Sequence, residues 1–215
     1  MALELTGVDL LTETITTARL LLRPWLRADA EDIVACCNDP DIANWLPLLP
    51  SPYTLPDAHT FIADMAWAQQ RAGTGLPLAM EDAATGHLVG SIGIGGITNV
   101  RGAEIGYWVA AFSRGRGYAA EATAVLAAWA FGHGLHRVQL LAATGNVPSQ
   151  RVAKRAGFLR EGVLRVPTTA GTAYPGTWCC TAGCPPMNLR RTFSGGDPAV
   201  TGHEQHPFGP WACCW

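Results

Sequence analysis

The chain has 215 residues, 48% of them hydrophobic, which suits one domain with a sizeable core and a short appendage. A net charge of −2 gives no reason to expect a nucleic-acid partner or binding to an anionic membrane surface. No apolar run reaches the length of a membrane span, and the first residues lack the basic start of a signal peptide, so we expect no membrane association and a cytoplasmic location. The 7 cysteines are odd in number and lack zinc-finger spacing, so we expect neither a disulfide framework nor a metal.

Hydrophobic periodicity predicts strands and helices between residues 17 and 164. Strands are predicted over 17–25, 76–81, 87–97, 103–110, 137–143 and 158–164. Helices are predicted over 29–38, 57–71, 118–132 and 146–156. Asp29 is expected to cap the first helix, and a proline-rich loop, Trp45–Tyr53, follows it. This order predicts an α/β fold built on one central sheet with helices packed against it.

The most informative segment is the glycine-rich turn, Arg114-Gly-Arg-Gly-Tyr-Ala119, which joins the strand at 103–110 to the helix at 118–132. At a helix N-terminus the first backbone N–H groups have no intrahelical partner, and the helix dipole adds partial positive charge. Gly115 and Gly117 let the backbone curl closely around a ligand, and the two arginines add full charge. We therefore expect this turn to bind the pyrophosphate of a cofactor.

The pattern Arg-x-x-Gly-x-Ala over residues 114–119 resembles the acetyl-CoA signature of the GNAT N-acetyltransferases. Further segments are similar to the ribosomal-protein-alanine (Rim-type) branch of that superfamily; they are Thr17–Trp25, Leu88–Gly93, Ala103–Trp108, Leu135–Val138 and Asn146–Phe158. The resemblance extends to Arg165, so we take residues 1–165 as one acetyltransferase domain. It implies a mixed central β-sheet flanked by helices, acetyl-CoA as co-substrate, no metal, and a primary amine as acceptor.

The resemblance also implies which residues hold acetyl-CoA. Backbone groups from Trp108 to Ala110 would pair with the pantetheine arm as an added strand, and Asn146 would bind the arm from the neighbouring strand end. The alternative for Asn146 is that it caps the helix that follows. The expected cofactor-binding residues are Trp108, Val109, Ala110, Arg114, Gly115, Arg116, Gly117, Tyr118, Ala119 and Asn146.

Direct attack of an amine on the thioester requires a base for the amine proton and an acid for the leaving thiolate. Glu104 is the candidate base, because strand alternation places its carboxylate with Gly106 and Trp108 on one face of the strand that leads into the glycine-rich turn. A structural hydrogen bond to a neighbouring loop is an equal alternative for Glu104. By resemblance, Ser149 is the candidate acid near the thioester sulfur; the alternative is that it only supports the helix start.

For the acceptor, the Rim-type resemblance implies a protein N-terminal amine. The alternatives are a small amine, such as an antibiotic or an amino-acid analogue, and a catalytically impaired module that only binds acetyl-CoA. Trp45, Leu48, Leu49 and Tyr53 either form a lip that clasps the acceptor or pack on the core. The loop at 38–56 lacks an acidic cluster, which disfavours a polycationic acceptor. The chain is expected to be a monomer or a homodimer.

After Arg165 the resemblance stops. Residues 166–215 show no sustained periodicity, so we expect an irregular tail in which the final β-hairpin of the family is absent or altered. Shifting the codons of Gly176–Asn188 by one base permits Arg-Asp-Leu-Val-Leu-Tyr-Ser-Arg-Leu-Pro-Thr-Asp-Glu, an alternating segment that looks like the missing last strand. We therefore hypothesise that the reading frame slips between Arg165 and Gly176; the alternative is a natural, divergent tail.

Overall fold

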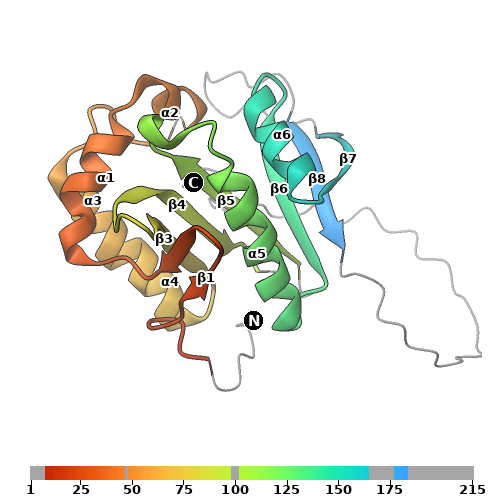
Figure 1. The fold of residues 1–215 in the computed structure, drawn as a ribbon, viewed down its shortest axis with the longest axis horizontal. Helices are drawn as coiled ribbons and strands as arrows, with labels where there is room; N and C mark the ends of the chain where they lie inside the picture. The colour runs from red at the N-terminus through yellow and green to blue at the C-terminus, as the bar shows by residue number, and fades with distance from the viewer. Residues whose placement is uncertain (1–7, 47, 98–101, 165–176, 184–215) are drawn as a thin grey trace, which may run out of the picture.

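The computed structural model describes residues 8–46, 48–97, 102–164 and 177–183. A single mixed sheet runs through the molecule (Figure 1). The strand order is β1-β2-β3-β4-β5-β6-β8-β7. The strands are β1 Ile15–Thr16, β2 Leu20–Arg23, β3 Leu76–Asp82, β4 Leu88–Gly95, β5 Gly102–Val109, β6 Arg137–Ala143, β7 Leu159–Leu164 and β8 Thr177–Gly183. Neighbouring strands are antiparallel, except that β5 and β6 are parallel. The predicted α/β fold with a mixed sheet is confirmed.

Helices cover both faces of this sheet. They are α1 Ala30–Cys37, α2 Pro40–Trp45, α3 Leu55–Thr60, α4 Trp67–Ala72, α5 Tyr118–Gly132 and α6 Val147–Arg155. A π-helical segment, Phe61–Ala66, joins α3 to α4, and 3-10 turns at Arg27–Asp29 and Ala111–Ser113 precede α1 and the glycine-rich turn. The first four helices pack on one face, and α5 and α6 pack on the other (Figure 1).

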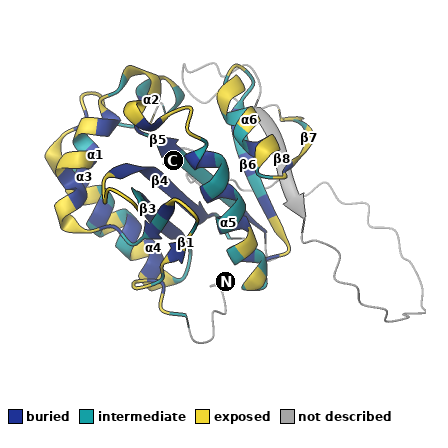
Figure 2. Ribbon diagram, in the orientation of Figure 1, coloured by how far each residue is buried: buried dark blue, intermediate teal, exposed yellow. Residues whose placement is uncertain are grey.

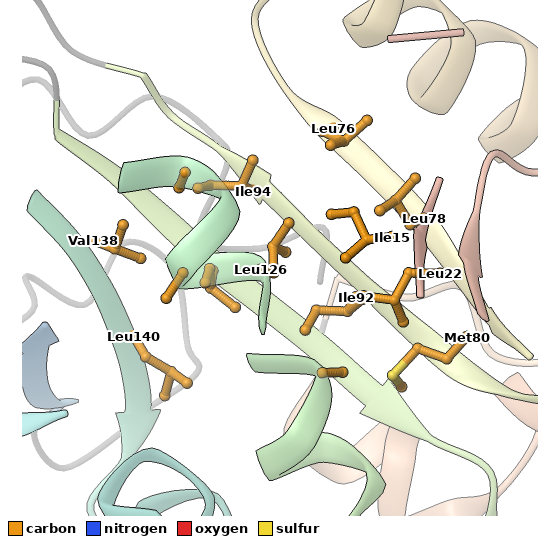
Figure 3. Packing of buried hydrophobic residues seen from close by; sticks show 14 of the residues in the cluster. Ile15, Leu22, Leu76, Leu78, Met80, Ile92, Ile94, Leu126, Val138 and Leu140 are labelled. Atoms are coloured by element: carbon orange, nitrogen blue, oxygen red, sulfur yellow. The ribbon is translucent and has the colours of Figure 1, made fainter. Parts of the chain in front are cut away.

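Two clusters of buried apolar side chains hold the sheet between these layers, and β4 is buried at every position (Figure 2). On the α5 face, Leu126 reaches from the helix toward Ile92 and Ile94 of β4 (Figure 3). On the opposite face, the fully buried Trp25 stacks on Trp108 of β5, with ring centroids 6.5 Å apart. The core therefore fixes β5, which leads into the glycine-rich turn, from both faces.

The parallel ladder between β5 and β6 is short. It comprises the pairs Gly102–Arg137, Ala103–Val138 and Glu104–Gln139, although β5 continues to Val109 and β6 to Ala143. Beyond Glu104, β5 stays paired with β4 along its other edge, and β6 stays paired with β8. Strands that separate in the middle of a sheet expose backbone donors and acceptors that a ligand or water must satisfy. We call this region, beyond the Glu104–Gln139 pair, the β5–β6 opening.

The predicted boundaries of the helix at 118–132 and of the strand at 137–143 are confirmed residue for residue. The helix α2, Pro40–Trp45, is not predicted from the sequence; the proline-rich loop follows it, and the described residues between Leu46 and Tyr53 form neither helix nor strand, as expected. Asp39 accepts hydrogen bonds from the N–H groups of Asp41 and Ile42, and Pro40 occupies the first helical turn. Asp29 occupies the N-cap position of α1 as predicted, but its side chain makes no capping hydrogen bond; its carboxylate instead accepts hydrogen bonds from the Arg23 guanidinium and the Leu26 N–H group.

The expectation of an irregular tail is wrong for Thr177–Gly183, which forms β8 between β6 and β7. Its backbone pairs with Arg137–Ala143 on one side and with Leu159–Leu164 on the other. The pairing of β7 with β8 contradicts the absence of the final hairpin strands, and the alternative that the hairpin is altered stays a prediction. The rest of the predicted tail, 166–176 and 184–215, and the position of the proposed frame slip lie outside the described residues.

We retain the frame slip as a proposal. A strand is held by its backbone, so β8 forms with the side chains of either frame, and its span coincides with the alternating part of the shifted reading. We expect DNA sequencing of an independent clone to find an inserted or deleted base between codons 165 and 176. An intact frame through these codons would instead identify the tail as natural.

Candidate functional site

The glycine-rich turn has the backbone geometry that its two glycines predict. Gly115 has φ +76° and Gly117, the N-cap of α5, has φ +85°, a region that residues with a Cβ rarely adopt. The first N–H groups of α5 lie directly after this bend. The turn thus brings together a helix N-terminus and a backbone that can approach an anion closely.

Arg19, the residue directly before β2, supports the turn from outside. The Arg19 guanidinium donates to the Glu121 carboxylate at 2.6 and 2.8 Å and to the carbonyl oxygen of Arg116 at 2.9 Å. It also lies over the Tyr118 ring, 4.9 Å from the centroid. Burial works in the opposite direction, but hydrogen bonds from Thr17 and Arg19 hold the pKa of Glu121 below its usual range. Arg19 therefore offsets a negative charge that would otherwise repel an anion at the start of α5.

The arginines of the turn are used differently. Arg114 forms ion pairs with Asp39 at 2.6 Å and with Asp41 at 2.9 Å, which links the turn to α2. The hydrogen bond from Arg114 holds the pKa of Asp39 below its usual range. The charge of Arg114 is thus shared with two carboxylates, whereas the Arg116 side chain is exposed. The expected contribution of full charge to an anion now rests mainly on Arg116.

Tyr118 and Ala119 are buried at the start of α5, and the Tyr118 hydroxyl donates to the carboxylate of Asp82. Their side chains therefore help to pack the helix start, and only their backbone faces the bend. In β5, Trp108 is buried against Trp25. The N–H group of Ala110 donates to the carbonyl of Val89, and the Trp108 carbonyl oxygen also faces β4, directly against the place of a Cβ added at Gly90. The expected backbone pairing with a pantetheine arm therefore rests chiefly on Val109.

Glu104 lies at the point where the β5–β6 ladder ends. Its carboxylate accepts a hydrogen bond of 3.1 Å from the Gln139 side chain, and it belongs to the same face of β5 as Trp108. Burial raises the pKa of Glu104, while the Gln139 amide acts in the opposite direction. Glu104 thus makes a structural hydrogen bond, but to the neighbouring strand β6 rather than to a loop, and this bond is compatible with a carboxylate whose proton affinity suits a base.

Asn146 and Ser149 meet at the start of α6. The side-chain oxygen of Asn146 accepts a hydrogen bond of 3.1 Å from the N–H group of Ser149, which confirms the capping alternative for Asn146. The Ser149 hydroxyl contacts the Tyr107 hydroxyl of β5 at 2.9 Å. The sequence predictions missed Tyr107, Gln139 and Arg19; for Tyr107 the available signal was alternation, which places it on the face of β5 opposite Glu104.

The four residues expected either to form a lip around the acceptor or to pack on the core differ in their surroundings. Tyr53 is buried and Leu49 packs against the core, as the alternative reading foresaw, whereas Leu48 is 58% exposed. Trp45, at the end of α2, reaches the turn before α6: a Cβ added at Gly145 would lie 3.6 Å from the Trp45 ring. With the Arg114 ion pairs, this contact makes α2 span from the glycine-rich turn to the start of α6.

A separate pocket of about 390 Å³ lies between α1, the β3–β4 turn and Phe112. It contains none of the predicted site residues. Within the described part of the chain, no group of three or more His, Cys, Asp or Glu side chains is placed to hold a metal ion. No described helix is long and apolar enough to cross a membrane.

Comparison with known proteins agrees with this geometry. The family model described as an acetyltransferase (GNAT) domain matches residues 19–159. The uncharacterized N-acetyltransferase YoaA of Bacillus subtilis is 31% identical over 153 residues, which cover 70% of this chain and 85% of YoaA. The putative ribosomal N-acetyltransferase YdaF of B. subtilis is 43% identical over 82 residues, 37% of this chain and 45% of YdaF. The structure of Mycobacterium smegmatis RimJ in complex with CoA-disulfide superposes with a TM-score of 0.69 and 26% identity, covering 76% of this chain and 81% of RimJ.

The turn geometry predicts the effect of a matched pair of glycine substitutions. Gly117→Ala forces a Cβ into a left-handed residue, at a cost of about 1–2 kcal/mol, and distorts the bend. If the distorted bend loses roughly 1.4 kcal/mol of the free energy of CoA binding, the dissociation constant for CoA rises about tenfold. We expect calorimetry to measure an increase of at least about this size.

Gly86→Ala is the control, because Gly86 has φ +71° in the β3–β4 turn and no heavy atom lies within 4 Å of an added Cβ. Both variants should lose similar thermal stability, but only Gly117→Ala should lose affinity. Equal CoA affinity in the two variants would contradict the assignment of the glycine-rich turn.

Proposed function

The chain belongs to the acetyltransferase (GNAT) family, and we propose that it transfers the acetyl group of acetyl-CoA to the α-amino group of a protein N-terminus. Family membership makes it an acetyl-CoA-dependent N-acetyltransferase with an amine acceptor, and the proposal concerns which amine that is. It is supported by similarity to YdaF, named a putative ribosomal N-acetyltransferase, and to RimJ. This similarity also favours the Rim-type branch.

The observation that carries the proposed mechanism is the β5–β6 opening, with Glu104 and Ser149 associated with opposite faces of the sheet. We place the pyrophosphate on the glycine-rich turn and the pantetheine arm along Trp108 and Val109, toward Asn146. The amine then approaches from the face of Glu104, which accepts its proton. Ser149 serves the leaving thiolate from the other face, so the base and the acid act from different sides of the strand as the tetrahedral intermediate forms and collapses.

The acceptor side fits a peptide better than a polyamine. Asp39 and Asp41, the carboxylates at the start of α2, are both paired with Arg114, so they offer little attraction to a polycation. Trp45, which reaches the turn before α6, and the exposed Leu48 in the loop after α2 provide apolar surface. Such a surface suits the first side chains of a peptide, whose single α-amine supplies the nucleophile.

We expect the full chain to release CoA thiol from acetyl-CoA in the presence of a peptide with a free N-terminal alanine. The same peptide with a blocked N-terminus and an internal lysine should give only background release, because the proposed acceptor is the α-amine. Spermidine and amino-acid amides serve as the competing small amines.

Faster turnover with a small amine than with the peptide would overturn the acceptor assignment and favour the small-amine alternative. Binding of acetyl-CoA without turnover on any amine would favour the impaired binding module. Mass spectrometry of the product distinguishes α-amino from lysine acetylation.

The environment of Glu104 predicts a pH dependence. A base must be ionised to accept a proton, and burial raises the pKa of Glu104, so kcat/KM should increase with pH through a value above the usual glutamate range. Glu104→Gln should lower kcat by about 100-fold, a common value for general-base catalysis, with CoA affinity unchanged.

Gln139→Leu is the matched variant, since it keeps the carboxylate but removes the amide that lowers its pKa. The acid limb of the profile should therefore move to higher pH. A full rate in Glu104→Gln would reduce Glu104 to a structural role.

A further inference from the structure

The hydroxyl groups of Tyr107 and Ser149 lie 2.9 Å apart, although they come from a central strand and from the first turn of α6. Each is fixed independently of the other. Tyr107 packs against the buried cluster on the α5 face, and the backbone of Ser149 is held by the Asn146 cap. The contact joins β5 to the start of α6, across the region where β5 and β6 no longer pair.

A serine hydroxyl is a poor final source for the proton that a departing thiolate needs, because serine does not ionise in the pH range of proteins. A phenol ordinarily titrates at about 10, much closer to a thiol at about 8.5, and proton transfer is efficient when such values match. A second donor that gives a proton to the serine oxygen, while the serine proton moves to the thiolate, avoids the formation of a serine alkoxide. The neighbouring phenol meets that requirement in distance and in chemistry.

We propose that Tyr107 is the proton source for the leaving thiolate and acts through Ser149. This inference rests on the proposed function and deepens it. Tyr107 donates its hydrogen bond to Ser149, so the serine proton is directed toward the thioester sulfur. Tyr107 is thus a positioning residue for Ser149, and Ser149 is the group that meets the sulfur.

The proposed step conserves bonds, electron pairs and protons. The C–N bond forms and the C–S bond breaks, with the electron pair of that bond going to sulfur. Ser149 gives its proton to the thiolate, and the Tyr107 proton moves to the Ser149 oxygen, which leaves a phenolate. The proton lost by the amine resides on Glu104, and solvent returns both groups to their starting states.

The test is a double-substitution cycle in the full chain, Tyr107→Phe and Ser149→Ala, with kcat, KM and CoA affinity measured across pH. Each single change should lower kcat about tenfold or more, the lower part of the range for general acids, while the CoA dissociation constant changes less than about twofold. Because Tyr107 acts through Ser149, the double variant should be no slower than Ser149→Ala. The alkaline limb of the kcat profile should disappear in Tyr107→Phe, since a phenol must be protonated to donate.

Gln150→Ala is the structural control. It removes hydrogen bonds that the Gln150 side chain makes to the carbonyls of Ala143 and Thr144 at the same helix start, so it tests simple loosening and should retain the alkaline limb. Multiplicative losses in the double variant, or an unchanged limb in Tyr107→Phe, would overturn the inference while the wild-type chain remains active. No turnover by the wild-type chain with any amine would instead count against the proposed function itself.

Discussion

The early end of the β5–β6 ladder is the constraint on which the rest of the site depends. Backbone groups in the middle of a sheet normally pair, and an unsatisfied buried group costs roughly 1–3 kcal/mol. Here the parallel pairing stops at Glu104 and Gln139, although both strands continue and stay paired with β4 and β8 on their outer edges. The sheet is thereby stable enough to keep an opening at its centre, where an extended ligand can supply the missing partners.

The charges around this opening are largely balanced by neighbouring protein groups. Arg19 offsets Glu121 beside the start of α5, and Arg114 is shared by Asp39 and Asp41. What is left for an anion is chiefly backbone N–H groups, the helix dipole and the exposed Arg116. A site of this kind recognises a phosphate by the shape of its backbone, so the geometry of Gly115 and Gly117 matters more than the number of cations nearby.

Local signals in the sequence were sufficient for the elements that carry the cofactor side. The boundaries of α5 and β6 follow from apolar periodicity, and the positive φ of the two glycines follows from the turn pattern. Two elements depend on nonlocal partners and were missed. α2 is a single short helix whose periodicity is too brief to detect, and Arg114, 73 residues from Asp41, helps to hold it. β8 lacks a strand-like pattern, and it is recognisable only because β6 and β7 pair with its backbone.

The difference between local sequence signals and nonlocal partners also explains which site residues the sequence could predict. Alternation along β5 places Glu104 and Tyr107 on opposite faces, but only the folded chain brings Gln139 to one and Ser149 to the other. This separation has a chemical consequence. An acid and a base that touched each other would exchange a proton and lose their function, whereas a strand between them leaves the reacting thioester as their shared neighbour. A single strand, through its two-residue period, thus keeps the proposed base for the amine apart from the groups proposed to serve the sulfur.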